Sequence, residues 1–178
     1  MVKIFLILLA GLNLLFVSMP ALRAQSLEEN TVIAALALNI VRFTTWPPDA
    51  LTKTADAIDF CVVGDNVVQQ SFISIDDKAI GNRKIHVVNL TRLRNFEQCQ
   101  VLYISDMKQN VLLQVFAEIK SLPILTIGQG SDFALTGGMV GLENIDEKIT
   151  MNVNLTVVRD SNLNISARLL KLAKVSGG

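Results

Sequence analysis

Apolar residues repeat at helical spacing along residues 31–45, which predicts an amphipathic helix there. Two apolar sets are interleaved, one containing Val32 and Leu36 and the other containing Ile33 and Ala37. Together they make the apolar stripe wider than one face of a small domain needs. The helix is therefore either buried on two sides, or buried on one side and in contact with a partner on the other. The candidate dimer or partner contacts are Val32, Leu36, Ile40, Phe43 and Trp46.

Apolar runs bounded by glycine or polar residues predict strands in the middle of the chain, and the continuous run at 58–63 predicts a buried strand. These runs cover residues 58–63, 84–90, 101–105 and 123–127. Helical periodicity returns between them, clearly at 107–120 and more weakly at 67–75. Strands that alternate with helices are joined by crossover connections. The pattern therefore predicts an α/β fold with a three-layer, largely parallel sheet flanked by helices.

The last third of the chain departs from this alternation. Residues 139–142 and 148–155 each have the pattern of a strand, and the polar segment 143–147 between them is typical of a turn. These residues predict an antiparallel, hairpin-like edge at the C-terminal end of the sheet. Residues 163–174 then predict a closing helix, with Leu169 facing inward.

The N-terminal residues predict a signal peptide that is cleaved after export. Lys3 precedes an apolar run at 4–17, and these 14 residues are fewer than the roughly 20 that a membrane-spanning helix needs. This length disfavours the alternative, an uncleaved membrane anchor. Small residues then lead to an expected cleavage position near Ala24. Removal of residues 1–24 leaves one domain at 25–178, which we expect in the periplasm.

Composition and charge disfavour metal and nucleic-acid binding. The formal net charge is zero, and the two cysteines, Cys61 and Cys99, lie far from the single histidine, His86. Their spacing does not match a zinc site, so we predict no metal. In an exported protein an even cysteine pair predicts a disulfide, with two buried free thiols as the alternative. A bridge across 38 positions would stabilise the fold by about 4 kcal/mol.

A basic segment lies between Asp77 and Glu97, where no acidic residue occurs. Its positive side chains are Lys78, Arg83, Lys84, Arg92 and Arg94. Such a segment either meets an acidic partner or an anionic ligand, or protects an exposed strand from aggregation. Arg92 and Arg94 are its candidate partner contacts.

No combination of residues predicts an active site. Gly128 and Gly130 follow a predicted strand, but the third glycine of a dinucleotide-binding loop is missing. The chain has no nucleophile-elbow serine and no carboxylate pair spaced for acid and base catalysis. We therefore predict no catalytic residue and no cofactor. An alternative function is small-ligand binding at the carboxyl ends of the parallel strands. Its candidate residues are Asp65, Gly128, Gly130 and Asp132.

Several short motifs resemble, in order, those of the YfiR-like periplasmic proteins. Residues 38–47, LNIVRFTTWP, resemble the family's signature that ends in Thr-x-Trp-Pro, and residues 60–65, FCVVGD, follow it. The later matches are at residues 99–104, 123–127, 137–140, 152–155 and 165–173. Ile40 and Thr45 depart from the signature, where the family usually has an aromatic and an acidic residue. The resemblance covers nearly the whole mature chain.

The resemblance implies a regulator and not an enzyme. YfiR-like proteins are associated with repression of a membrane diguanylate cyclase from the periplasm, often beside an outer-membrane lipoprotein that relieves it, and they tend to dimerise. Cys61 and Cys99 match the family's cysteine pair, which supports the disulfide. The expected partners are a membrane diguanylate cyclase or another membrane sensor, an outer-membrane lipoprotein and a second copy of the chain.

Overall fold

A computed structural model describes residues 19–52, 56–146 and 148–177, and it gives side-chain positions from Ser26 onward. The expected signal peptide therefore lies mostly outside the described residues. The first described element, α2 (Met19–Arg42), runs through the expected cleavage position near Ala24. Within the described ranges, no helix combines the length and the hydrophobicity that a membrane span requires.

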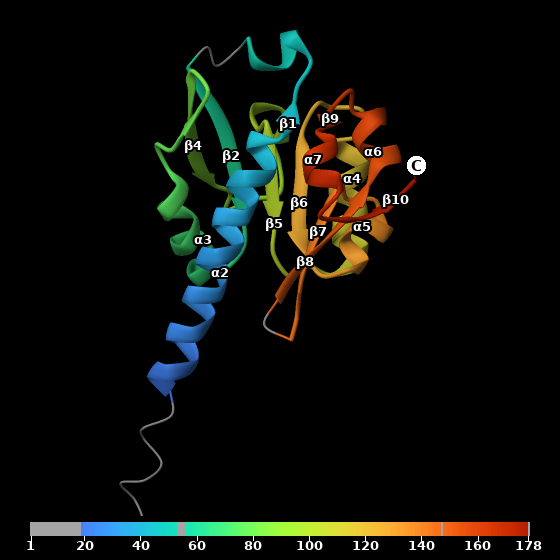
Figure 1. The fold of residues 1–178 in the computed structure, drawn as a ribbon. Coiled ribbons are helices and arrows are strands. Elements are labelled where there is room, and N and C mark those ends of the chain that lie inside the picture. The colour runs from blue at the N-terminus through green and yellow to red at the C-terminus, as the bar shows by residue number, and fades with distance from the viewer. Residues whose placement is uncertain (1–18, 53–55, 147, 178) are drawn as a thin grey trace, which may run out of the picture.

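An eight-stranded sheet forms the centre of the fold (Figure 1). In spatial order its strands are β10 (Lys174–Ser176), β8 (Lys148–Asn154), β7 (Val140–Ile145), β6 (Leu125–Gln129), β5 (Val101–Ile104), β2 (Ala57–Val63), β4 (Arg83–Asn89) and β3 (Ala79–Ile80). Strands β4, β2, β5, β6 and β7 are parallel neighbours, whereas β8 pairs antiparallel with β7. The predicted parallel sheet with an antiparallel C-terminal hairpin is confirmed.

Helices cover both faces of the sheet, because its central strands are apolar on both sides. On one face α2 and α3 (Asn66–Phe72) pack in the larger core, and on the other α4 (Gln109–Glu118) packs in the smaller core. Alternate residues of β5 divide between them, since Tyr103 belongs to the larger core and Leu102 to the smaller one. Figure 1 shows α2 and α4 on opposite sides of the sheet, so the three-layer prediction is confirmed.

The predicted helix at 163–174 is wrong as one continuous element. Its residues form β9 (Asn164–Ile165), the single turn α7 (Ala167–Leu170) and the edge strand β10. Ser166 follows β9 and caps α7, with its hydroxyl accepting from the backbone N–H of Leu169 at 3.4 Å. The chain then extends again and pairs with β8, which satisfies backbone groups of that strand.

Several short elements are absent from the sequence prediction. After Gly130 the chain forms α5 (Asp132–Thr136), and β8 ends at Asn154, whose side chain caps α6 (Leu155–Asp160). Thr44 and Thr45 form β1, which pairs antiparallel with β9 instead of continuing the helix. The remaining short turns are η1 (Pro48–Leu51), η2 (Ile73–Ile75) and η3 (Phe96–Gln98).

Candidate functional site

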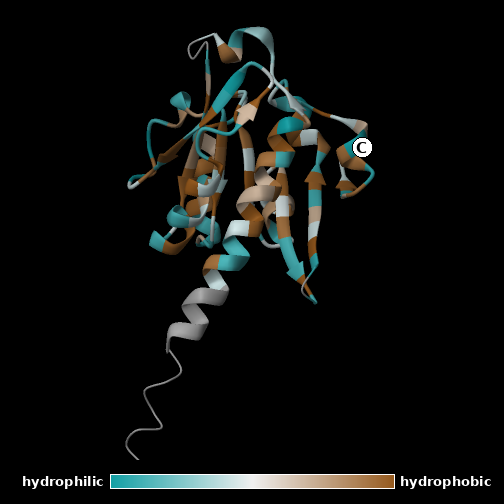
Figure 2. Cartoon of the chain, turned by 60° about the vertical axis from the view of Figure 1, so that its left-hand side comes forward, coloured by the Kyte–Doolittle hydropathy of each residue, from teal (hydrophilic) through white to brown (hydrophobic). Residues whose placement is uncertain are grey.

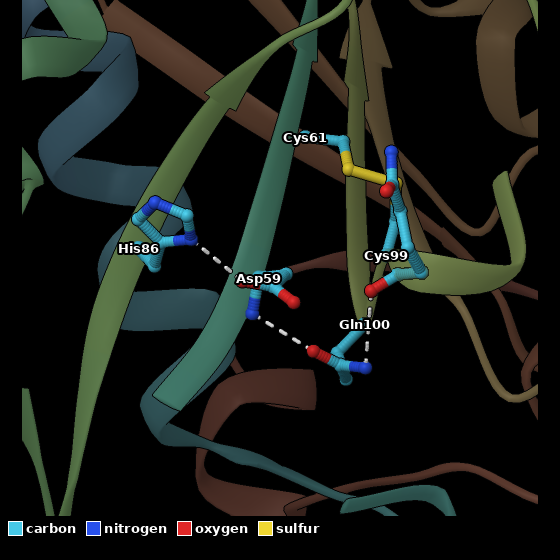
Figure 3. Close-up of a disulfide and its surroundings, with 6 residues drawn as sticks. Asp59, Cys61, His86, Cys99 and Gln100 are labelled. Atoms are coloured by element: carbon cyan, nitrogen blue, oxygen red, sulfur yellow. Dashed lines mark hydrogen bonds and ion pairs between the residues drawn. A yellow bond between two sulfur atoms is a disulfide. The ribbon is translucent and has the colours of Figure 1, made fainter. Parts of the chain in front are cut away.

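The predicted disulfide between Cys61 and Cys99 is confirmed (Figure 3). Cys61 lies in β2 and Cys99 just before β5, with their Cα atoms 5.7 Å apart. Both residues are buried in the smaller core, together with Phe96 and Leu112. The bridge therefore holds the segment that enters β5 against the neighbouring strand β2.

Gln100 connects this disulfide to the end of α2. Its backbone carbonyl accepts a hydrogen bond from the indole Nε1 of Trp46 at 3.3 Å and one from the backbone N–H of Leu125 at 2.9 Å. Its side-chain Oε1 accepts from the backbone N–H of Asp59 at 2.8 Å, which Figure 3 also shows. Trp46 is buried, so it anchors the chain that leaves α2 to the centre of the sheet. The sequence analysis missed Gln100, although a polar residue beside Cys99 at the start of an apolar run was a signal.

His86 and Asp59 form a cross-strand pair beside the disulfide. The Nδ1 atom of His86 lies 2.8 Å from Oδ1 of Asp59, and the two residues are register partners in β4 and β2. The His86 side chain is 64% exposed, whereas that of Asp59 is 16% exposed. The pair therefore fastens β4 to β2 at the surface. In the parts of the chain that are described, no three or more His, Cys, Asp or Glu side chains are grouped as metal ligands.

The structure divides the apolar residues of α2 between the core and the surface. Ile40 is 2% exposed and Trp46 8%, so neither of these candidate contacts reaches solvent as a side chain. Val32 is 48% exposed and Phe43 38%, while Leu36 is half-buried. Figure 2 shows hydrophobic and hydrophilic residues mixed along α2. We define the outward face of α2 by its exposed residues Val32, Ala35, Asn39 and Arg42, together with Phe43 at its end.

The basic segment does not form one surface. Lys84 lies near the start of β4 and pairs with Asp77 at 3.7 Å, whereas Arg92 and Arg94 follow the opposite end of that strand. Seven residues of extended chain separate the two groups by about 20 Å. Arg92 and Arg94 therefore form a separate basic loop, and both are exposed.

The candidate ligand residues are distributed over two neighbouring clefts at the carboxyl ends of the strands. Asp65 and Arg92 line a cleft of about 510 Å³, while Gly130 and Asp132 line another of about 390 Å³. Gly128 lines neither of these clefts. It lies instead against Phe133 of α5, and a Cβ at this position would be 2.2 Å from ring atoms of that residue. The glycine is therefore needed for helix packing, which the sequence analysis did not anticipate.

Comparison with protein families identifies the scaffold. A family model described as YfiR/HmsC-like matches residues 30–174, which run from the middle of α2 to the start of β10. The chain belongs to the YfiR/HmsC-like family. Membership of the YfiR/HmsC-like family supports a periplasmic regulator in cyclic di-GMP signalling, and not an enzyme. The buried Trp46 and the disulfide lie in segments that carried the resemblance.

Proposed function

We propose that this protein is a non-enzymatic periplasmic regulator that binds a membrane-bound diguanylate cyclase and holds it inactive. The observation that carries the proposal is the YfiR/HmsC-like match over residues 30–174. A soluble domain represses a membrane protein only if it binds the inactive state more tightly than the active one. The domain must therefore expose a surface that distinguishes the two states.

The outward face of α2 is our candidate for that surface. Val32 and Phe43 expose apolar area at two places along the helix, and Ile73 on the adjoining η2 is 61% exposed. Polar residues lie between them, with Nη1 of Arg42 donating to Oδ1 of Asn39 at 3.1 Å. Apolar side chains among polar neighbours are typical of protein–protein contacts. Arg92 and Arg94 would supply a separate electrostatic contact.

The same proposal includes export and assembly. We expect the signal peptide at residues 1–24 to be removed, which leaves the YfiR-like periplasmic domain at 25–178. Sequencing the N-terminus of protein from the periplasm should give a start near Gln25. The protein is also expected to form a homodimer and to meet an outer-membrane lipoprotein that relieves repression. Sedimentation of the purified protein tests the dimer, and an unchanged monomer mass at high concentration would contradict it.

The decisive experiment measures cyclic di-GMP in cells that lack the gene. Deletion should raise cyclic di-GMP, and the wild-type protein supplied in trans should lower it again. A variant that carries Val32→Glu and Phe43→Glu should fail to lower it, because two buried charges at an interface oppose binding. Immunoblotting checks that the variant reaches the periplasm in wild-type amounts.

Leu135→Glu is the matched control, because Leu135 is 73% exposed but lies on α5, away from α2. This control should restore low cyclic di-GMP as well as the wild type does. Unchanged cyclic di-GMP after deletion would refute the repressor function. Full repression by the doubly substituted protein would refute only the assignment of the surface to α2.

A further inference from the structure

The chain changes direction across the sheet between β2 and β5. From β2 it passes through α3 to β4 on one side, and from β5 it passes through α4 to β6 on the other. The helices that follow these two neighbouring strands therefore pack on opposite faces of the sheet. In open α/β sheets, loops that diverge in this way leave a crevice at the carboxyl ends, where ligands bind.

A cleft of about 510 Å³ occupies this position. It is bounded by the three loops that follow β2, β4 and β5. Its lining residues are Val63, Gly64, Asp65, Gln69, Leu90, Thr91, Arg92, Leu93, Ser105, Asp106 and Met107. We call this the switch-point cleft. Its volume is within the range of small-molecule sites. Six of its lining residues are polar or charged, and they lie beside the apolar Val63, Leu90, Leu93 and Met107.

The loops around the switch-point cleft are held by specific contacts. Oδ1 of Asp65 accepts from the backbone N–H groups of Val67 and Val68 at 2.9 Å each, and Nε2 of Gln69 donates to the carbonyl of Gly64 at 3.0 Å. Gly64 also allows close approach, because a Cβ there would lie 2.8 Å from Oγ of Ser105. The wall after β2 is therefore fixed without a ligand.

The loop that carries Arg92 is held in place at its C-terminal end. The loop that leaves β4 passes through Asn95 in the left-handed region, with φ of 61°, and then buries Phe96 in the smaller core. Three residues later the disulfide holds Cys99 to β2. The backbone of these loops is therefore held in place before a ligand binds, which lowers the entropic cost of binding.

Charged groups of both signs line the switch-point cleft. Arg92 supplies a guanidinium, while Asp65 and Asp106 supply carboxylates. Among the described residues, the side chains of Arg92 and Asp106 make no hydrogen bond or ion pair, and both residues are exposed. A simple anion would meet two carboxylates, and a simple cation would meet the guanidinium. A ligand that carries both charges can pair with Arg92 and Asp106, and with the second carboxylate oxygen of Asp65, whose Oδ1 already caps α3.

We propose that the switch-point cleft binds a small zwitterion, with its anionic group on Arg92, its cationic group on Asp106 and Asp65, and its apolar part against Leu90, Leu93 and Met107. This site goes beyond the proposed repression of a cyclase and does not depend on it. Binding to the purified protein is measured without the cyclase, so either proposal can fail while the other stands.

The test titrates small molecules of defined charge into oxidised protein purified from the periplasm. The zwitterionic probes are glycine, β-alanine, γ-aminobutyrate and leucine, which differ in charge separation and apolar size. Inorganic phosphate is the anionic probe and putrescine the cationic one. At least one zwitterion should bind saturably and shift the backbone amide resonances of Gly64 and Ser105. Phosphate and putrescine should each bind at least about tenfold more weakly than that zwitterion.

Two variants and two matched controls assign the charges. Arg92→Gln and Asp106→Asn should each weaken the bound zwitterion about tenfold, because each removes one charge-assisted hydrogen bond. Arg94→Gln, on the same loop, and Asp49→Asn, at an exposed position on η1 outside both clefts, should leave its Kd within about twofold. Circular dichroism verifies that every variant is folded. The proposal is overturned if no zwitterion binds saturably, if phosphate or putrescine binds equally well, or if Arg92→Gln leaves the Kd unchanged.

Discussion

Replacement of Tyr103 by phenylalanine should stabilise the protein. Tyr103 is fully buried on β5, and its hydroxyl has no hydrogen-bond partner among the described residues. A buried polar group without a partner costs about 1–3 kcal/mol. Phenylalanine removes this cost and keeps the ring contact with Phe72, at 4.4 Å between centroids. In a domain of this size each kcal/mol raises Tm by about 2–4 °C.

The same substitution should remove a loss of stability in alkaline solution. Burial, assisted by the negative charge of Glu29, raises the pKa of Tyr103 well above its usual range. The unfolded chain releases the tyrosine proton near its ordinary pKa of about 10, whereas the folded protein retains it. The unfolded state then binds fewer protons, so stability falls as pH rises above about 10, by up to about 1.4 kcal/mol per pH unit. The phenylalanine variant lacks this contribution.

Both effects can be measured cleanly because the chain has one tyrosine and one tryptophan. Fluorescence of Trp46 follows urea unfolding at each pH, and near-ultraviolet absorbance reports tyrosinate directly. Circular dichroism of the same sample shows whether the protein is still folded when the tyrosine ionises. The reasoning fails if Tyr103→Phe lowers stability at neutral pH, or if wild type and variant lose stability equally above pH 10.

Three further substitutions test the contacts that hold the sheet and its loops. The double variant Cys61→Ala, Cys99→Ala should lose about 4 kcal/mol in urea unfolding, and each single variant nearly as much, because each breaks the same 38-residue closure. Gly128→Ala should cost about 1–3 kcal/mol through its clash with Phe133, and the cost should shrink in a Phe133→Leu background. Asp65→Ala should lower stability by about 1 kcal/mol through loss of the α3 cap, while Asp65→Asn should retain most of it. Thermal unfolding measures the last two, and wild-type Tm values in both would contradict these assignments.

The sheet and its C-terminal hairpin could be predicted because their signals are local. An uninterrupted apolar run such as Ile58 to Val63 suits a strand that is buried on both faces, whatever the strand order. The disulfide followed from the expected compartment and the cysteine count. In contrast, the pattern around Leu169 and Leu170 fits one long helix as well as one short turn. Only the pairing of β10 with β8, which is a long-range contact, decides between the two.

The candidate site was less predictable, because it depends on strand order. Asp65, Arg92 and Asp106 are separated in sequence and come together only because β4 and β5 lie on either side of β2. The exposed residues of α2 could not be predicted for a similar reason. Periodicity showed two sets of residues, but the packing of the helix decides that Ile33 is buried and Val32 is exposed.

The two proposed surfaces are physically connected through α3. Its first turn is capped by Asp65 in the switch-point cleft. Near its last turn the hydroxyl of Ser71 donates to the carbonyl of Val67 at 2.8 Å, and its Oγ lies 3.5 Å from the carbonyl oxygen of Leu27 on α2. A second contact joins α2 to the sheet, because Oδ1 of Asn30 on α2 accepts from Nε2 of Gln129 in β6 at 3.2 Å. α3 therefore contacts both surfaces, and a ligand whose affinity depends on the arrangement of α3 is coupled to the packing of α2. If the cyclase binds the outward face of α2, the two sites share a coupling free energy, and each must alter the affinity of the other by the same factor. A zwitterion in the cleft would then act on repression by changing which state of the α2 surface is populated.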